Sequence, residues 1–191
     1  KGYEVLVSDG GTIAARFRRE LQAHEIPFEE GGHSMDKILA AHEVVKSPGI
    51  GSHLPVVQAI RNQGIPLMSE VEFAFRYMGD SRMVAITGSN GKTTTTSLLF
   101  HICKAAGLDC AFVGNIGFSI ARQVAIDPRP LYIAEISSFQ LDDISTFRPH
   151  IAILTNITED HLDRYNYQFQ NYINAKFKII QNQQATDFFI Y

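Results

Sequence analysis

Short apolar runs alternate with longer amphipathic segments along the chain. In residues 12–25, Ile13, Phe17, Leu21 and His24 recur at helical spacing and line one face of a predicted helix. Helices of this kind between β-branched runs are typical of βαβ units and predict a parallel sheet. The elements expected first are strand 3–9, helix 12–25, strand 26–31, helix 34–43, the extended run 44–49, helix 54–64 and helix 66–78.

A polar break at residues 78–82 precedes a second block of the same α/β kind, so we expect domains over 1–80 and 81–191. The elements expected in this block are strand 83–87, helix 91–107, strand 110–114, helix 118–125, strand 131–137, strand 150–156, helix 167–182 and strand 186–191. In the late helix, Phe169, Ile173, Phe177 and Ile180 form the apolar stripe, and Lys176 does not lie on it.

The composition, with 45% hydrophobic and 19% charged residues in a chain of 191, is that of an ordinary globular protein. The apolar runs are far shorter than the roughly 18 residues of a membrane span. A net charge of −3 offers no basic surface for nucleic acid. We therefore expect a cytoplasmic protein without a membrane span or a nucleic-acid partner. Cys103 and Cys110 are expected to be buried hydrophobes without chemistry.

The two ends of the chain both fall inside expected strands, and the first residue, Lys1, is not methionine. We interpret the chain as a fragment of a longer protein in which both expected domains are incomplete.

Residues 88–93, GSNGKT, follow an expected strand and open an expected helix. Backbone N–H groups and the helix dipole can bind phosphate oxygens in that position. Gly88 and Gly91 let the backbone approach closely, Lys92 would reach the terminal phosphates, and Thr93 would ligate Mg²⁺. The common P-loop has four residues between its glycines and this loop has two. The order of groups still favours a phosphate site over a turn that merely caps a helix.

Two further expected strands end in polar residues. Glu135 lies near the end of strand 131–137, and a carboxylate there could share Mg²⁺ with a nucleotide. Parallel strands present their carboxyl ends to one crevice, which favours a site over a solvated edge or a charged surface loop. The polar residues that follow these two strands are Ser137, Ser138 and Gln140, and then Asn156, Glu159, Asp160, His161, Asp163 and Arg164.

Taken together, these motifs resemble the ATP-dependent Mur ligases of peptidoglycan precursor synthesis, relatives of folylpolyglutamate synthetase. TGSNGKT is similar to the family's ATP loop, and EISSFQL looks like the member that adds D-glutamate. The other matching segments are SPGI (47–50), GNIG (114–117), TNITEDHLDRY (155–165) and YINAK (172–176). The resemblance implies a Rossmann-like UDP-binding domain over residues 1–80. It implies part of a P-loop-containing, parallel-sheet ATPase domain over residues 81–191.

The resemblance also implies roles for individual residues. Lys92 resembles the lysine that binds the β- and γ-phosphates, Thr93 and Glu135 the pair that holds a first Mg²⁺, and His161 a ligand of a second. Lys176 resembles the lysine that is carbamylated by CO₂ and completes that second site. The implied ATP-binding residues are Gly88, Ser89, Asn90, Gly91, Lys92, Thr93 and Thr94. The implied substrate-binding residues are Asp9, Ser47, Pro48, Gly49, Asn115, Ser137 and Gln140, with Asn115 also near the phosphates.

The activity implied is ATP-driven amide bond formation that adds D-glutamate to UDP-N-acetylmuramoyl-L-alanine through an acyl phosphate, by a monomeric enzyme. The fragment itself is expected to have little or no activity. Three alternatives remain at this stage: another Mur ligase, a ligase like folylpolyglutamate synthetase, and a P-loop switch that binds nucleotide without ligation.

Overall fold

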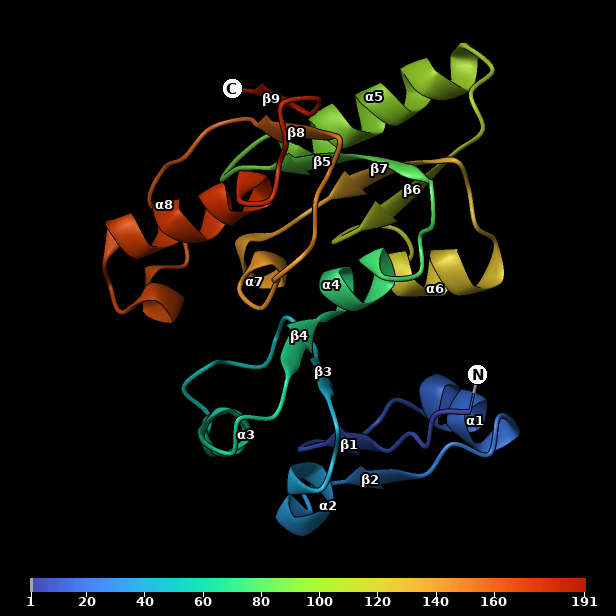
Figure 1. The fold of residues 1–191 in the computed structure, drawn as a ribbon, viewed down its shortest axis with the longest axis vertical. Helices are drawn as coiled ribbons and strands as arrows, with labels where there is room; N and C mark the ends of the chain where they lie inside the picture. Colours follow the sequence, from blue (N-terminus) through green and yellow to red (C-terminus); the bar gives the residue numbers. More distant parts are fainter. Residues whose placement is uncertain (1) are drawn as a thin grey trace. The chain divides into compact units, whose positions relative to one another are not determined.

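The computed structural model describes residues 2–191, which form two compact units (Figure 1). Of the described residues, unit 1 contains 2–44 and Ser52–Pro66, and unit 2 contains Val45–Gly51 and Leu67–Tyr191. The short segment 45–51 therefore belongs to the unit that also holds residues 88–91, which we call the phosphate loop. The domain boundary predicted near residue 80 is not the boundary between these two units, and it stays a prediction.

Unit 1 is built on two short parallel strands, β1 (Val7–Asp9) and β2 (Phe28–Glu30), joined through helix α1 (Ala15–Ala23). The parallel pairing agrees with the βαβ pattern of the sequence. Phe17, which belongs to the apolar face predicted for α1, is 44% exposed. The unit also contains α2 (Met35–Leu39) and α3 (Pro55–Asn62).

The predicted helix over residues 66–78 is wrong in its first part. The chain forms strand β4 (Leu67–Ser69), which pairs with β3 (Val44–Lys46), before helix α4 (Glu70–Phe75) begins. Ser69 ends the strand and caps the helix, because its side chain accepts a hydrogen bond from the Glu72 N–H. A three-residue strand is too short to show a period of two against a helical background.

Unit 2 contains a five-stranded sheet in the order β6-β7-β5-β8-β9, and every neighbouring pair is parallel. This confirms the α/β fold class expected from the sequence. The strands are β5 (Arg82–Thr87), β6 (Cys110–Gly114), β7 (Leu131–Glu135), β8 (Ile151–Leu154) and β9 (Phe188–Ile190).

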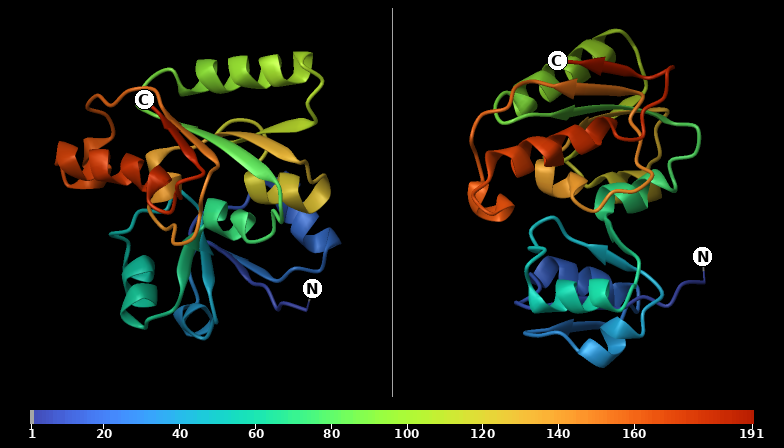
Figure 2. Two further views of the ribbon diagram at one scale, coloured as in Figure 1. Left: turned by 45° about the horizontal axis from the view of Figure 1, so that its top comes forward. Right: turned by 60° about the vertical axis from the view of Figure 1, so that its left-hand side comes forward.

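Helices cover both faces of this sheet (Figures 1 and 2). On one face, α5 (Lys92–Ala105) packs Cys103 against Val84 and Ile86. Cys103 and Cys110 are both free and buried, as expected. The larger core lies on the other face, which is covered by α4, α6 (Ile120–Ile126), α7 (Ser138–Leu141) and α8 (Phe169–Phe177). None of the helices in residues 2–191 combines the length and apolar character needed to cross a bilayer.

The buried face of helix α8 is shifted from the one that its apolar residues indicate, although Phe169 and Ile180 of the predicted stripe still pack against the core. Phe177 of the predicted stripe is 40% exposed, whereas Lys176 is only 2% exposed. The helix continues into a 3₁₀ turn, Lys178–Ile180. The buried residues of this helix and turn are Tyr172, Ala175, Lys176 and Ile179.

The strand register brings the ends of four strands, β5, β6, β7 and β8, to one edge of the sheet. Ile86 is level with Glu135, and Glu135 is level with Gly114. Thr87 is level with Leu154 on the other side of β5. The segments that follow these strands therefore meet at this edge, and they contain the candidate site.

Candidate active site

The phosphate loop, residues 88–91, has a backbone that requires glycine at two positions. Gly88 has φ of 148°, and a Cβ there would overlap the Thr155 hydroxyl. Gly91 adopts a left-handed conformation, with φ of 80°, immediately before α5 begins. L-residues with a Cβ are strained at such angles, so the two glycines permit the close turn from β5 into α5.

The loop is held in shape by the segment that follows β8. Ser89 N donates to Asn156 O at 2.9 Å, and Asn90 N donates to the Asn156 side-chain oxygen at 3.0 Å. The Thr155 hydroxyl donates to Asn90 O at 2.7 Å. Ser89 Oγ donates to Thr158 O at 2.9 Å and accepts from Thr158 N at 3.0 Å. Sequence reasoning did not identify this clasp, although the polar run TNIT directly after β8 is its signal.

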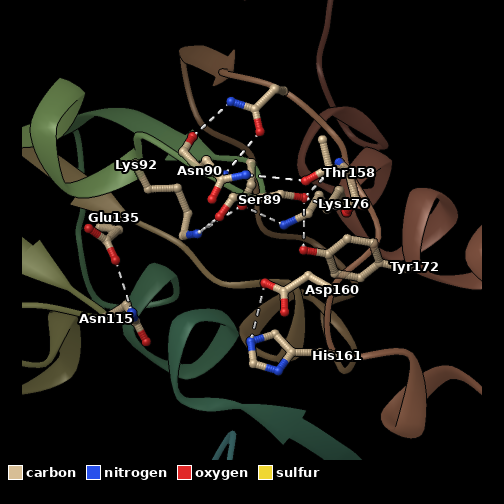
Figure 3. Close-up of polar contacts among 12 residues, drawn as sticks. Ser89, Asn90, Lys92, Asn115, Glu135, Thr158, Asp160, His161, Tyr172 and Lys176 are labelled. Carbon is tan, nitrogen blue, oxygen red and sulfur yellow. Dashed lines mark hydrogen bonds and ion pairs between the residues drawn. The ribbon is translucent and has the colours of Figure 1, made fainter.

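Two lysines from different helices meet at the phosphate loop (Figure 3). Lys92 Nζ donates to Gly88 O and Ser89 O, both at 2.9 Å. Lys176 Nζ donates to Gly88 O at 2.7 Å. The loop carbonyls thus hold both side-chain nitrogens against the loop.

Lys176 is enclosed by protein. Its Nζ lies 4.5 Å from the centre of the Tyr172 ring, and the Tyr172 hydroxyl lies 3.2 Å from Ser89 Oγ. Burial, together with the positive charge of Lys92, lowers the pKa of Lys176 to about 8, against a smaller opposing effect of Asp160. A substantial fraction of this amine is therefore neutral near pH 8.

Glu135 is buried at the end of β7, with 1% exposure, and its two carboxylate oxygens have separate partners. The Thr93 hydroxyl donates to Oε2 at 2.8 Å, and the Asn115 amide donates to Oε1 at 2.9 Å. Gly114 brings the Asn115 backbone close, because a Cβ at Gly114 would overlap Glu135 O. Thr94, the other threonine assigned to ATP binding, is exposed in the first turn of α5.

A pocket of about 420 Å³ lies beside Asn115. It brings together four residues that the sequence assigned to substrate binding: Ser47, Pro48, Asn115 and Gln140. Gly49 lies in the same turn as Ser47 and Pro48. Glu70 also lines the pocket and was not identified from the sequence.

Ser137 and Gln140 bond to each other at the start of α7. The Gln140 side-chain oxygen accepts from Ser137 N at 2.9 Å, and Ser137 Oγ accepts from Gln140 N at 3.4 Å. This reciprocal capping box satisfies backbone groups that the helix leaves unpaired. These two side chains therefore have a local structural role in addition to the position of Gln140 at the pocket.

His161 lies in the loop between β8 and α8 with a left-handed backbone, φ 49°. Its Nε2 is 3.6 Å from Asp160 Oδ2, and its ring packs on Phe139 with centroids 5.1 Å apart. Within residues 2–191, no hydrogen bond joins His161 to Lys176. Asp9 belongs to unit 1, where its carboxylate accepts the Gly11 N–H at 2.8 Å.

The site does not contain a ready-made metal cage. Among the residues that the structure describes, no three His, Cys, Asp or Glu side chains cluster closely enough to hold an ion. The chemistry of the donors nevertheless suits Mg²⁺ at one position, because the Thr93 hydroxyl and the Glu135 carboxylate are oxygen ligands 2.8 Å apart. Water, a nucleotide phosphate or a modified side chain would complete the coordination.

Comparison with known sequences decides which family uses this arrangement. The Mur ligase middle domain matches residues 86–191, and the MurD N-terminal domain matches residues 1–56. The chain belongs to the Mur ligase family.

Several Mur ligases are similar to the whole chain. UDP-N-acetylmuramoylalanine–D-glutamate ligases of Bacteroides fragilis and Porphyromonas gingivalis are each 54% identical over 191 residues. The comparison covers 100% of this chain, and the chain spans 43% and 42% of the length of these two relatives.

Solved Mur ligase structures share the fold. UDP-N-acetylmuramate:L-alanyl-gamma-D-glutamyl-meso-diaminopimelate ligase from Neisseria meningitides has a TM-score of 0.62 at 22% identity, covering 98% of this chain and 63% of that one. UDP-N-acetylmuramate-alanine ligase from Thermotoga maritima has a TM-score of 0.52 at 22% identity, covering 92% of this chain and 40% of that one. At this identity the likeness supports the fold alone.

Proposed function

We propose that this chain provides the nucleotide site and part of the acceptor site of an ATP-dependent ligase that joins D-glutamate to UDP-N-acetylmuramoyl-L-alanine. One observation carries the proposal: Asn115 belongs to both parts of the site. Its amide donates to Glu135 at 2.9 Å beside the phosphate loop, and Asn115 also lines the 420 Å³ pocket. An acceptor in that pocket would lie next to a nucleotide phosphate.

The choice of D-glutamate as the added amino acid rests on the relatives. Those with 54% identity over the whole chain are named as D-glutamate ligases. Because the chain spans less than half of their length, the complete reaction, with its substrates and its place in peptidoglycan precursor synthesis, is a proposal for the full-length protein. We place this reaction in the cytoplasm, where both nucleotide substrates are available.

The phosphate loop would hold the ATP phosphates. The N-terminus of α5 favours negative charge, and the 14-residue helix is long enough to carry a substantial dipole, whereas Ser89 N and Asn90 N are engaged by Asn156. Lys92 now donates to two loop carbonyls, and its flexible side chain can move from them to the β- and γ-phosphates. The clasp residues Asn156 and Thr158 would keep the loop open for this purpose.

We propose that Thr93 and Glu135 hold a first Mg²⁺ and that His161 and a carbamate on Lys176 hold a second. The chemistry that bound Mg²⁺ supplies is neutralisation of charge on the phosphate oxygens during phosphoryl transfer. The lowered pKa of Lys176, about 8, supports carbamate formation, since CO₂ reacts with a neutral amine. A carbamate ¹³C resonance under ¹³CO₂ in the full-length protein, absent from Lys176→Arg, tests the modification. A spectrum that is identical in both proteins would refute it.

In the proposed reaction, an oxygen of the acceptor carboxylate attacks the γ-phosphorus of ATP and ADP leaves. The resulting acyl phosphate is attacked by the amine of D-glutamate, which forms the amide, releases phosphate and loses a proton to water. The residues of this chain orient rather than react. Asn115 and Gln140 would position the acceptor in the pocket, and Lys92 would stabilise charge that develops on the transferred phosphoryl group.

The test is phosphate release from ATP by the full-length protein, measured with and without each acceptor. We expect release to require both UDP-N-acetylmuramoyl-L-alanine and D-glutamate. Lys92→Ala should lower kcat by about 10²- to 10³-fold, the cost of one electrostatic donor. Lys104→Ala is the matched control, because Lys104 is an exposed lysine in the last turn of the same helix.

The outcome also separates the alternatives. Turnover that prefers another amino acid would assign the protein to a sister ligase or to a folylpolyglutamate synthetase-like enzyme. ATP hydrolysis that ignores the acceptor would favour a nucleotide-driven switch. Either result would overturn the proposed function.

A further inference from the structure

One wall of the acceptor pocket is a tight turn that we call the pocket turn, residues 47–50. Ser47 and Pro48 line the pocket, and Ile50 N donates to Ser47 O at 3.0 Å to close the turn. The turn belongs to unit 2 although it lies far in sequence from the other pocket residues. Two of its backbone carbonyls accept hydrogen bonds from a residue far along the chain in that unit.

Arg164 holds these two carbonyls. Its guanidinium donates through Nη2 to Pro48 O and through Nη1 to Gly49 O, both at 3.1 Å. The two oxygens are consecutive along the backbone, and the planar fork of a guanidinium can reach both at once. Arg164 is partly exposed; its bond to Pro48 O is partly buried and its bond to Gly49 O is exposed.

The same arginine contacts the segment that carries His161. Arg164 lies in the 3₁₀ helix Leu162–Tyr165. This helix begins at the residue that follows His161. The guanidinium carbon is 4.5 Å from the centre of the Phe139 ring, and the His161 ring packs on Phe139. Phe139 comes from α7, which also places Gln140 in the pocket.

The other end of the pocket turn has an independent anchor. Lys46 Nζ donates to Ile50 O at 2.9 Å and pairs with Asp143 at 3.1 Å, with both side chains almost completely buried. Removing Arg164 would therefore loosen Pro48 and Gly49 without releasing the whole turn. This makes the role of Arg164 separable from folding of the turn.

We infer that Arg164 is a positioning residue for the acceptor: its guanidinium fork couples the pocket turn to the packed rings of Phe139 and His161. The inference rests on the proposed function, because the proposed function assigns the acceptor to this pocket. Arg164 would act through the turn and need not touch the substrate. Its loss should weaken acceptor binding while the phosphate loop, which has its own clasp, keeps its affinity for ATP.

The experiment compares Arg164→Ala and Arg164→Lys in the full-length protein. Steady-state KM values for UDP-N-acetylmuramoyl-L-alanine and ATP are measured, with calorimetric Kd for the acceptor. For Arg164→Ala we expect acceptor KM and Kd to rise about tenfold or more, the scale of charge-assisted hydrogen bonds, and ATP KM to change less than about twofold. Arg164→Lys should recover only part of the loss, because one ammonium group cannot hold both carbonyls in the same geometry.

Arg129→Ala provides the matched control. Arg129 forms surface ion pairs with Asp109 and Asp127, at 2.9 and 2.6 Å, and precedes β7 at the end away from Glu135. This variant should keep both KM values. A parallel rise of acceptor and ATP KM in Arg164→Ala, unchanged acceptor binding, or full recovery by lysine would overturn the inference. Absence of ligation in the unmodified protein would instead overturn the proposed function, and the inference with it.

Discussion

Glu72 is a buried carboxylate that holds together two distant parts of unit 2. It lies on α4 with no exposed surface, and it accepts hydrogen bonds from the segment that leads into β8. Ser145 N and Phe147 N donate to Oε2 at 2.9 and 2.8 Å, and Thr146 N donates to Oε1 at 3.0 Å. The Ser145 and Thr146 hydroxyls also donate to this carboxylate. The amide of Glu72→Gln has one acceptor oxygen in place of two, so this substitution tests the interaction with little change of shape.

The magnitude follows from the loss of charge. Hydrogen bonds to a charged acceptor contribute about 1.5–3 kcal/mol and neutral ones about 1 kcal/mol, and the new amide N–H₂ also faces donors. With a loss of about 1 kcal/mol at each of the three backbone N–H bonds, Glu72→Gln should lower the free energy of unfolding by about 3 kcal/mol. For the unfolding transition of a domain of about 150–250 residues, that corresponds to a fall in Tm of about 6–12 °C.

The pH dependence gives a second, independent measure. Burial by itself raises the pKa of Glu72, but the hydrogen bonds from Thr146, Ser145 and Phe147 outweigh it and hold the pKa below the ordinary 4.5. A carboxyl of this kind stabilises the fold above pH 4.5, and the contribution is lost as the pH falls through the folded-state pKa. Stability of the unmodified protein should therefore fall more steeply in acid than that of Glu72→Gln.

Glu70 is the matched control, two residues away on the same helix. Burial raises the pKa of Glu70, although hydrogen bonds including the 2.6 Å bond from Ala121 N oppose the shift. Ionisation of Glu70 thus costs stability as the pH rises above 4.5, and Glu70→Gln should leave Tm at pH 7 equal or higher. The assay is differential scanning calorimetry of the full-length variants. A Glu72→Gln protein whose Tm at pH 7 lies within about 2 °C of the unmodified protein would refute the reasoning.

Two further predictions concern the phosphate loop. Ser89→Ala removes three contacts of Ser89 Oγ, with Thr158 N, Thr158 O and the Tyr172 hydroxyl, and should raise the KM for ATP about three- to tenfold while acceptor KM changes little; steady-state kinetics check this, and an unchanged ATP KM would contradict it. Lys176 has a pKa of about 8 in the fold against an ordinary 10.5, so the stability of the unmodified protein should rise between pH 8 and 10.5 in CO₂-free buffer, and Lys176→Met should abolish that rise. Parallel Tm curves for the two proteins over this range would show that the lysine is not desolvated.

The local pattern of the sequence was sufficient for much of the sheet and for the loop. The predicted strand 110–114 coincides with β6, because a short apolar run that ends in glycine has few other solutions. The turn from β5 to α5 follows from Gly88 and Gly91, whose positive φ angles suit glycine best. The four-residue helix α7 was missed, since a single turn does not show a helical period.

What the sequence by itself determined, then, was the order of most strands and helices, without β4 and α7, and the residue types at each strand end, because these depend on neighbours a few positions apart. The tertiary structure alone decided which face α8 buries: the apolar stripe indicated Phe177, yet Lys176 is inside. Lys176 Nζ reaches Gly88 O across 88 positions of sequence, and the buried hydrogen bond and the Tyr172 ring offset the cost of burying the amine. Periodicity measures the average apolarity of a helix face. It contains no information about a carbonyl group that another strand places opposite that face.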